Sequence, residues 1–115
     1  MQKLVDDFIE MNCSGLVLEL CEKYYDENVT MLNDGAVFAS SMREAYNKQK
    51  GFIETVQEFN VTLVSQIISG DIVELIFDYK MTGADSKRIE FIGKHIQTWK
   101  NQKIVREEYF PVVME

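Results

Sequence analysis

Histidine, proline and cysteine are scarce in this sequence, and each shortage limits what the protein can be. The 115 residues include one histidine, one proline and two cysteines. One histidine and two cysteines without a Cys-x-x-Cys spacing do not form a zinc ligand set, so we predict no metal site. Cys13 and Cys21 are expected to be free, buried thiols. The sequence also lacks a glycine-rich phosphate loop, a dinucleotide fingerprint and a nucleophile elbow, so we predict no cofactor.

Basic residues are too few for a partner with a phosphate backbone. Lysine and arginine total 12 against 19 acidic residues, which gives a net charge of −7. Such a surface repels nucleic acids and anionic membranes, so we predict neither as a partner. No apolar run is long enough to span a bilayer, and Asp6 and Asp7 fall where a signal peptide needs apolar residues. We therefore expect a cytoplasmic protein.

The composition is that of an ordinary globular domain. Hydrophobic residues make up 46% of the chain and charged residues 27%, which argues against disorder. A chain of this length fits one domain, and we predict a single domain over residues 1–115.

Helices are predicted in the first half of the chain. Apolar residues recur at helical spacing in residues 4–9 and 16–24, and a run of turn-forming residues separates the two segments. Ser41 and Glu44 have the spacing of a capping box, which predicts that a third helix begins there.

The remaining elements are predicted to be strands. A short strand at residues 29–32 ends at Asn33-Asp34-Gly35, a turn signal. Four longer strands follow, over residues 61–68, 72–81, 88–100 and 103–113. Their connections are short, which predicts an antiparallel meander. Helices followed by a sheet indicate an α+β domain.

The two faces of the long strands differ in composition. Tyr79, Trp99 and His95 belong to the faces that carry large aromatic side chains, which we expect helices to cover. The opposite faces mix isoleucines with charged residues. Because exposed apolar patches commonly mark interfaces, we predict a homodimer that forms through this outer face of the sheet.

Two stretches resemble the nuclear transport factor 2-like superfamily. They are residues 24–31 (YYDENVTM) and residues 95–110 (HIQTWKNQKIVREEYF), where Gln102 replaces the usual glycine. The order of elements is most similar to the SnoaL-like proteins, the polyketide cyclases and their relatives. This resemblance implies N-terminal helices packed on a curved, mostly antiparallel sheet that forms a conical pocket (a cystatin-like α+β barrel), usually in a dimer.

The resemblance does not imply one activity, because the fold hosts isomerases, dehydratases, cyclases and binding modules. In the similar ketosteroid isomerases, a tyrosine and two carboxylic acids act on the substrate. The corresponding positions are Phe8, Leu32 and His95. Phe8 has no hydroxyl and Leu32 accepts no proton, although a shift of two residues would bring Asp34 into play. Steroid-type isomerisation is therefore not expected.

His95 is the leading candidate for chemistry. It is the only histidine, and an imidazole exchanges protons near neutral pH. It could act as a general acid or base toward a carbonyl or hydroxyl group. The alternatives are a half-buried strand residue whose ring is satisfied by a neighbour or by water, and a residue that only contacts a ligand.

The partner of His95 depends on the register of the last hairpin. A tight turn at residues 101–102 would place Glu108 opposite His95. A bulge in that turn would instead bring Glu107 and Tyr109 to the face of His95. The resemblance favours the bulge, so we predict that Glu107 assists His95.

Three functions are open at this point. The first is a binding domain that holds a small apolar or aromatic molecule in an apolar pocket near His95. The second is a cofactor-independent lyase, isomerase or cyclase with His95 as general acid or base and Glu107 assisting. The third is a structural module whose cavity is filled by its own side chains. Ligand-binding residues are predicted at four aromatic positions, Tyr24, Tyr79, Trp99 and Tyr109.

Overall fold

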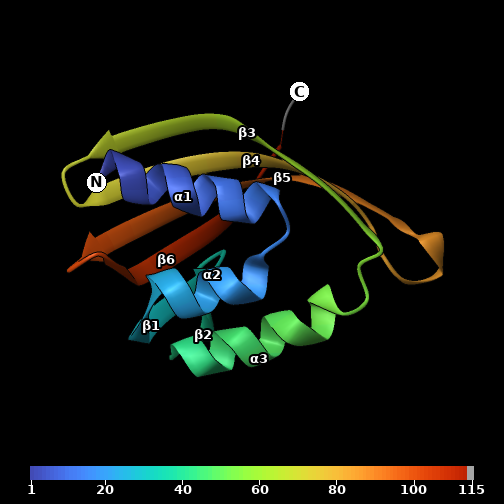
Figure 1. Ribbon diagram of the computed structural model, residues 1–115, viewed down its shortest axis with the longest axis horizontal. Coiled ribbons are helices and arrows are strands. Elements are labelled where there is room, and N and C mark those ends of the chain that lie inside the picture. Colours follow the sequence, from blue (N-terminus) through green and yellow to red (C-terminus); the bar gives the residue numbers. More distant parts are fainter. Residues whose placement is uncertain (114–115) are drawn as a thin grey trace.

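Three helices pack against one face of a six-stranded sheet in the computed structural model, which describes residues 1–113 (Figure 1). The elements are α1 (Gln2–Cys13), α2 (Val17–Tyr24), β1 (Tyr25–Asn33), β2 (Ala36–Ala39), α3 (Met42–Ile53), β3 (Glu58–Ser69), β4 (Ile72–Thr82), the 3-10 turn η1 (Ala84–Ser86), β5 (Arg88–Lys100) and β6 (Lys103–Val112). This is the α+β class that the sequence predicts. Across this part of the chain, no helix is long and apolar enough to cross a membrane.

The sheet has the strand order β2-β1-β6-β5-β4-β3 and is not closed into a barrel. The meander from β3 to β6 is antiparallel throughout, as predicted. Two features differ from the prediction. The first strand begins at Tyr25 and pairs with β6 in parallel, and β2 adds an antiparallel edge strand. Parallel pairing joins segments far apart in the sequence, so no local pattern announces it.

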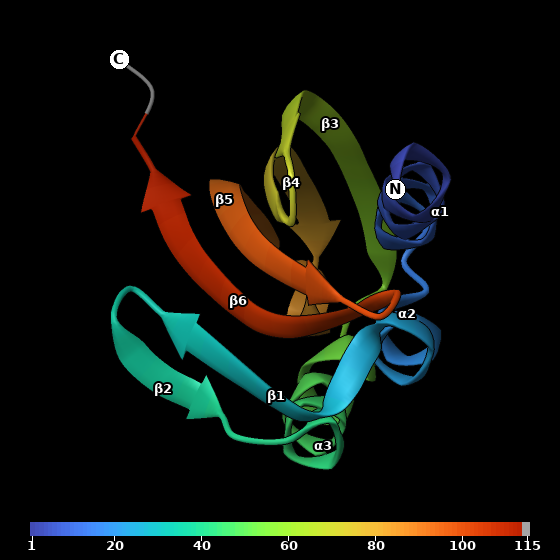
Figure 2. The same cartoon turned by 90° about the vertical axis from the view of Figure 1, so that its left-hand side faces the viewer.

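The sheet curves around the helices, as Figure 2 shows. Contacts join α1 to β3 and α3 to β1, while α2 packs against both of the other helices. At one end this packing is closed, because Trp99 lies edge-on to Tyr24 and Phe8 with ring centroids 5.5 and 6.5 Å away. Burying such large aromatic side chains supplies much of the driving force for folding.

Two of the predicted local signals are confirmed. The side chain of Ser41 accepts a hydrogen bond from the backbone of Glu44, whose carboxylate accepts one from the backbone of Ser40. This capping box starts α3 at Met42. Asp34 and Gly35 both have positive φ angles, 50° and 87°, in the tight turn between β1 and β2.

The last hairpin combines a tight turn with a bulge. Asn101 and Gln102 both adopt positive φ, 52° and 65°, which suits a two-residue hairpin turn. The bulge lies within β6, where Val105 has no partner on β5. The predicted position of the bulge, in the turn, is therefore wrong. Because one extra residue reverses the alternation, Glu107 nevertheless points to the inner face.

Candidate functional site

A cavity of about 340 Å³ opens between the helices and the inner face of the sheet. Most of its wall is apolar, and the apolar lining residues are Phe8, Val17, Leu20, Met31, Leu32, Phe38, Phe52, Ile53, Phe59, Met81 and Phe91. The polar lining residues are Asn12, Cys21, Tyr25, Asn33, Gln49, Tyr79, His95, Glu107 and Tyr109. An apolar wall with a few converging polar groups is the usual form of a small-molecule site.

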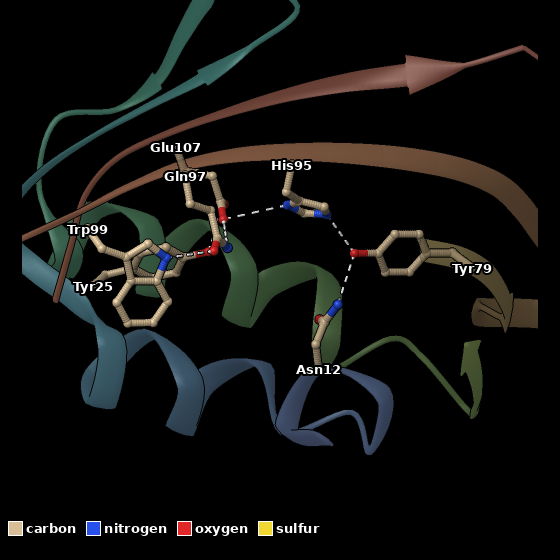
Figure 3. Close-up of polar contacts among 7 residues, drawn as sticks. All are labelled: Asn12, Tyr25, Tyr79, His95, Gln97, Trp99 and Glu107. Carbon is tan, nitrogen blue, oxygen red and sulfur yellow. Dashed lines mark hydrogen bonds and ion pairs between the residues drawn. The ribbon is translucent and has the colours of Figure 1, made fainter. Parts of the chain in front are cut away.

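His95 lies in the middle of β5, where strand alternation directs its ring toward the helices (Figure 3). Its Nε2 atom is 2.8 Å from the hydroxyl oxygen of Tyr79 on β4. That oxygen also accepts a hydrogen bond from Nδ2 of Asn12, 3.1 Å away at the end of α1. The His95 side chain is only 14% exposed, so the protein itself supplies most of its surroundings.

Glu107 faces the other side of the His95 ring and is 3% exposed. Its Oε1 atom accepts a 2.7 Å hydrogen bond from the hydroxyl of Tyr25, and Oε2 accepts one of the same length from Nε2 of Gln97. Since both oxygens accept, the carboxylate is stabilised in its ionised form. Burial raises the pKa of Glu107, but the charge of His95 and these hydrogen bonds outweigh burial and leave it below its ordinary value.

The contact between His95 and Glu107 is an ion-pair contact and not a hydrogen bond. Nδ1 of His95 is 3.6 Å from Oε2 of Glu107, which is too long for a hydrogen bond. Within residues 1–113, Nδ1 is the one buried side-chain nitrogen or oxygen without a hydrogen-bond partner. The Glu107 carboxylate therefore attracts a protonated ring nitrogen electrostatically, without fixing it by a hydrogen bond.

A second line of hydrogen bonds supports Glu107 from behind. Nε1 of Trp99 donates to Oε1 of Gln97 at 3.1 Å, which fixes the direction of the Gln97 amide. The amide nitrogen of Gln97 is thereby turned toward Glu107. Gln97 is fully buried, and this chain of contacts explains how a polar side chain is accommodated there.

Aromatic rings surround the outer part of the cavity. The ring of Phe91, 37% exposed, stacks on Tyr79 with centroids 4.7 Å apart. The ring of Tyr109 lies edge-on to His95 at 5.4 Å. It occupies space that is free only because residue 93 is glycine, since a β-carbon there would lie 2.4 Å from Cε2 of Tyr109. Burial raises the pKa of Tyr109, which keeps its hydroxyl protonated near neutral pH.

Four of the six predicted site residues line the cavity: His95, Glu107, Tyr79 and Tyr109. Tyr24 and Trp99 do not, because they pack together at its closed end. The hydroxyl of Tyr24 donates to Asp7, and burial together with Asp7 raises the pKa of Tyr24 to about 12.

Three further polar residues of this network were not among the predicted site residues. Tyr25 follows Tyr24 at the junction of α2 with β1, where one residue decides which side chain enters the cavity. Gln97 shares the strand face of His95 and Trp99, so a polar residue on an aromatic face was the available signal. Asn12 gave none, because asparagine near a helix end is ordinarily a turn former.

The structure also shows where the residues that correspond to the catalytic groups of ketosteroid isomerases lie. Phe8 and Leu32 both line the cavity, so apolar side chains stand there. Asp34 is exposed in the β1–β2 turn and is not part of the lining. For the described residues, no three metal-binding side chains lie close enough together to hold an ion.

No protein-family model and no curated protein matches the sequence. Solved structures do match. A protein from Mesorhizobium loti, provisionally named a SnoaL-like polyketide cyclase, superposes with a TM-score of 0.76 at 22% identity, covering 94% of this chain and 96% of that one. A cystatin-fold protein from Novosphingobium aromaticivorans superposes with a TM-score of 0.79 at 12% identity, covering 93% and 94%.

A third similar structure is a protein of ketosteroid isomerase-like fold from Catenulispora acidiphila, solved in complex with trimethylamine. Its TM-score is 0.75 at 11% identity, with 92% of this chain and 82% of that one covered. The chain therefore has the SnoaL-like, nuclear transport factor 2-like fold that the sequence resemblance predicted. Identities this low establish the fold and not the activity.

Proposed function

We propose that the cavity binds a small, largely apolar or aromatic molecule whose one hydrogen-bonding group lies at the polar end of the cavity, beside Tyr79 and His95. The observation that carries this proposal is the arrangement of the wall. Apolar side chains supply most of the lining, and the polar atoms gather where β4, β5 and β6 meet α1. A volume of about 340 Å³ suits a molecule of one or two rings. The trimethylamine bound to the Catenulispora acidiphila protein is a small molecule in the same fold.

The charges around the cavity disfavour an anionic ligand. No lysine or arginine is among the lining residues described above, and Glu107 places an ionised carboxylate inside the wall. A ligand carboxylate or phosphate would lose its hydration there without gaining a cation other than a protonated His95. Both oxygens of the buried Glu107 already accept hydrogen bonds from Tyr25 and Gln97, so a ligand cation gains no free acceptor there either. We therefore expect the ligand's polar group to be a carbonyl, a hydroxyl or a similar neutral group.

The test is a binding screen with matched pairs of compounds. One- and two-ring carbonyl or hydroxyl compounds are compared with carboxylates of the same skeleton by ligand-observed NMR. Ile53→Trp would fill the cavity from α3 and abolish binding of the neutral compounds. Val37→Trp adds the same side chain at a position that is 64% exposed and outside the lining, and should leave binding unchanged. Failure of all neutral compounds to bind, or binding that survives Ile53→Trp, would contradict the proposal.

We propose proton transfer as a second function, as in a cofactor-independent lyase, isomerase or cyclase. The specific observation is that His95 contacts two ionisable side chains, Tyr79 and Glu107, inside the cavity. Groups arranged in this way can take up and release a proton in a water-poor site. A protein of the same fold, from Mesorhizobium loti, is provisionally named a SnoaL-like polyketide cyclase.

Proton transfer is testable without the natural substrate. A bound carbonyl compound is incubated in D₂O, and exchange of the hydrogens next to its carbonyl is followed by NMR. We expect the wild-type protein to accelerate exchange and His95→Gln to lose the acceleration while still binding the compound. Equal exchange rates in both proteins would leave binding as the function and exclude His95 as general acid or base.

We also propose that the outer face of the sheet pairs two copies of the chain. This face carries apolar side chains beside charges of both signs. Ile76, Lys94 and Phe110 lie side by side across β4, β5 and β6. The flanking ion pairs are Lys94–Glu74 and Arg106–Glu108. Because both signs are present on one face, two copies related by a twofold axis can match charges while covering the apolar residues. The cytoplasmic location stays a prediction from the sequence.

A further inference from the structure

The hydrogen bonds around Tyr79 restrict where the proton of a neutral His95 lies. The hydroxyl oxygen of Tyr79 accepts from Asn12 at 3.1 Å and lies 2.8 Å from Nε2 of His95. With Asn12 as a donor, the O–H of Tyr79 is free to donate to Nε2. Nε2 then carries the lone pair, and the proton of the neutral ring is on Nδ1.

Glu107 favours the same arrangement from the opposite side of the ring. Its two oxygens already accept from Tyr25 and Gln97, so the carboxylate has no proton to offer. Oε2 lies 3.6 Å from Nδ1 of His95. A lone pair on Nδ1 would face an ionised carboxylate at that distance, whereas an N–H there is attracted to it. Both neighbours therefore stabilise the Nδ1–H tautomer.

We propose that the hydroxyl of Tyr79, and not a nitrogen of His95, is the group that exchanges a proton with the ligand, and that His95 acts behind it in the Nδ1–H tautomer. In the neutral tautomer Nε2 is occupied by Tyr79 and Nδ1 faces Glu107, which leaves neither nitrogen for a ligand. Tyr79 is thus the catalytic residue, with Asn12, His95 and Glu107 as positioning residues. The catalytic role of Tyr79 rests on the proton transfer proposed above, whereas the assignment of the Nδ1–H tautomer to His95 does not.

The proton movements balance within the network. When His95 is protonated, its Nε2–H donates to the oxygen of Tyr79, and the O–H of Tyr79 is released toward the cavity. Transfer of that hydroxyl proton to a ligand oxygen is accompanied by transfer of the Nε2 proton to Tyr79. The ligand gains one proton, His95 loses one, and Tyr79 ends as it began. Glu107 stays ionised throughout. In reverse, a ligand O–H protonates Tyr79 as the proton of Tyr79 passes to Nε2.

Proton exchange with Tyr79 limits which ligands can react. The atom beside Tyr79 must accept a hydrogen bond in one direction of the reaction and carry a proton in the other. A neutral carbonyl that becomes an enol or alcohol satisfies both requirements. Burial raises the pKa of Tyr79 well above its ordinary value, so the tyrosine keeps its proton unless His95 receives it in the same step.

The presence of a single histidine makes the tautomer directly measurable. Long-range ¹H–¹⁵N correlation spectra of uniformly ¹⁵N-labelled protein, recorded without ligand at alkaline pH, separate protonated from unprotonated ring nitrogens. We expect Nδ1 to show the signature of an N–H and Nε2 that of a nitrogen with a lone pair. The opposite pattern, with the proton on Nε2, would overturn the proposal. This measurement needs no variant and no ligand.

A pair of variants tests the role of Tyr79. Tyr79→Phe removes the donor to Nε2, so the Nε2 resonance should move toward that of an unbonded ring nitrogen. Tyr109→Phe is the matched control, because its ring also contacts His95, at 5.4 Å, but its hydroxyl makes no hydrogen bond to it among residues 1–113. An Nε2 resonance that is unchanged in Tyr79→Phe, or moved equally in both variants, would overturn the proposal.

Ligand affinity separates this inference from the proposed function. For a neutral carbonyl compound that binds the wild-type protein, we expect Tyr79→Phe to weaken binding about 5- to 10-fold, the effect of one hydrogen bond. Unchanged affinity would contradict a direct contact with Tyr79. If no compound of the panel binds, the proposed function fails while the tautomer measurement still decides the arrangement of His95.

Discussion

The hydroxyl of Tyr25 donates a 2.7 Å hydrogen bond to Oε1 of Glu107, a residue 82 positions further along the chain. Parallel pairing of β1 with β6 brings the two side chains together. Gln97 supplies the second donor. A carboxylate that is 3% exposed needs such donors to remain ionised. Tyr25 is therefore part of the site, because its hydroxyl helps to keep Glu107 ionised beside His95.

The lowered pKa of Glu107 makes stability depend on pH. Because the folded-state pKa lies below the ordinary value of 4.5, the carboxylate stabilises the fold fully above about pH 4.5. This contribution is lost as pH falls through the folded-state value. Glu107→Gln should lower the free energy of unfolding by about 1–3 kcal/mol at pH 7, since one amide oxygen cannot accept both donors as well. Urea denaturation as a function of pH measures both effects.

Glu108→Gln is the control for this prediction. Glu108 is on the outer face, paired with the exposed Arg106, and such a pair contributes at most about 1 kcal/mol. Below pH 4.5 the wild-type protein should lose stability more steeply than Glu107→Gln. If the unfolding free energies of the wild-type protein and Glu107→Gln fell in parallel with pH, the fold would not be stabilising the ionised form of Glu107.

Gly93 is expected to be required for the position of Tyr109. In Gly93→Ala the new β-carbon would lie 2.4 Å from Cε2 of Tyr109, so the ring must move away from the cavity. We expect a loss of about 1–2 kcal/mol in unfolding free energy, in the range of overpacking substitutions. The same substitution in a Tyr109→Ala background should be nearly neutral, because the clash is gone. An equal loss in both backgrounds would rule out this explanation.

The thiols are expected to be poor nucleophiles in the folded protein. Burial raises the pKa of Cys21 to about 12, with Glu107 and Glu22 adding to the effect, and burial also raises the pKa of Cys13. In Cys13→Ser, the remaining thiol should react with a disulfide reagent only as fast as the protein unfolds. The matched protein Cys21→Ser reports on Cys13, which is partly exposed and should react faster. Rapid labelling of Cys21 in the native protein would contradict its burial.

The outer face of the sheet should determine the oligomeric state. Ile76→Glu places a charge in the middle of the proposed interface and should convert a dimer to a monomer, as measured by sedimentation equilibrium. Val37→Glu, on the exposed edge strand β2, is the control and should leave the state unchanged. A wild-type protein that is monomeric at high micromolar concentration would exclude this interface.

Local patterns accounted for most of the fold. Alternation along Ile72–Thr82 and Arg88–Lys100 correctly separated the buried from the outer face, and the capping box located the start of α3. The strand β2 was missed because its four residues are too few for a periodic signal. The parallel pairing of β1 with β6 was missed because it depends on contacts between distant segments.

The site was predictable only in part, because register and junctions decide it. His95 and Glu107 meet because of one unpaired residue, Val105, whose place in β6 no turn signal specifies. Trp99 was expected in the pocket because it shares a strand face with His95. It lies instead beyond Gln97 at the closed end of the packing, against Tyr24 and Phe8. Strand alternation fixes the face of a side chain but not whether a cavity lies there.

The most direct test of the proposed ligand site is a crystal structure of the protein purified under mild conditions or soaked with a neutral ring compound that binds it. We expect density for a small molecule in the cavity, with a polar atom within hydrogen-bond distance of the Tyr79 hydroxyl. Glu107 should keep its contacts with Tyr25 and Gln97. A cavity closed by side chains such as Phe52 and Phe91, with the compound bound elsewhere or not at all, would contradict it.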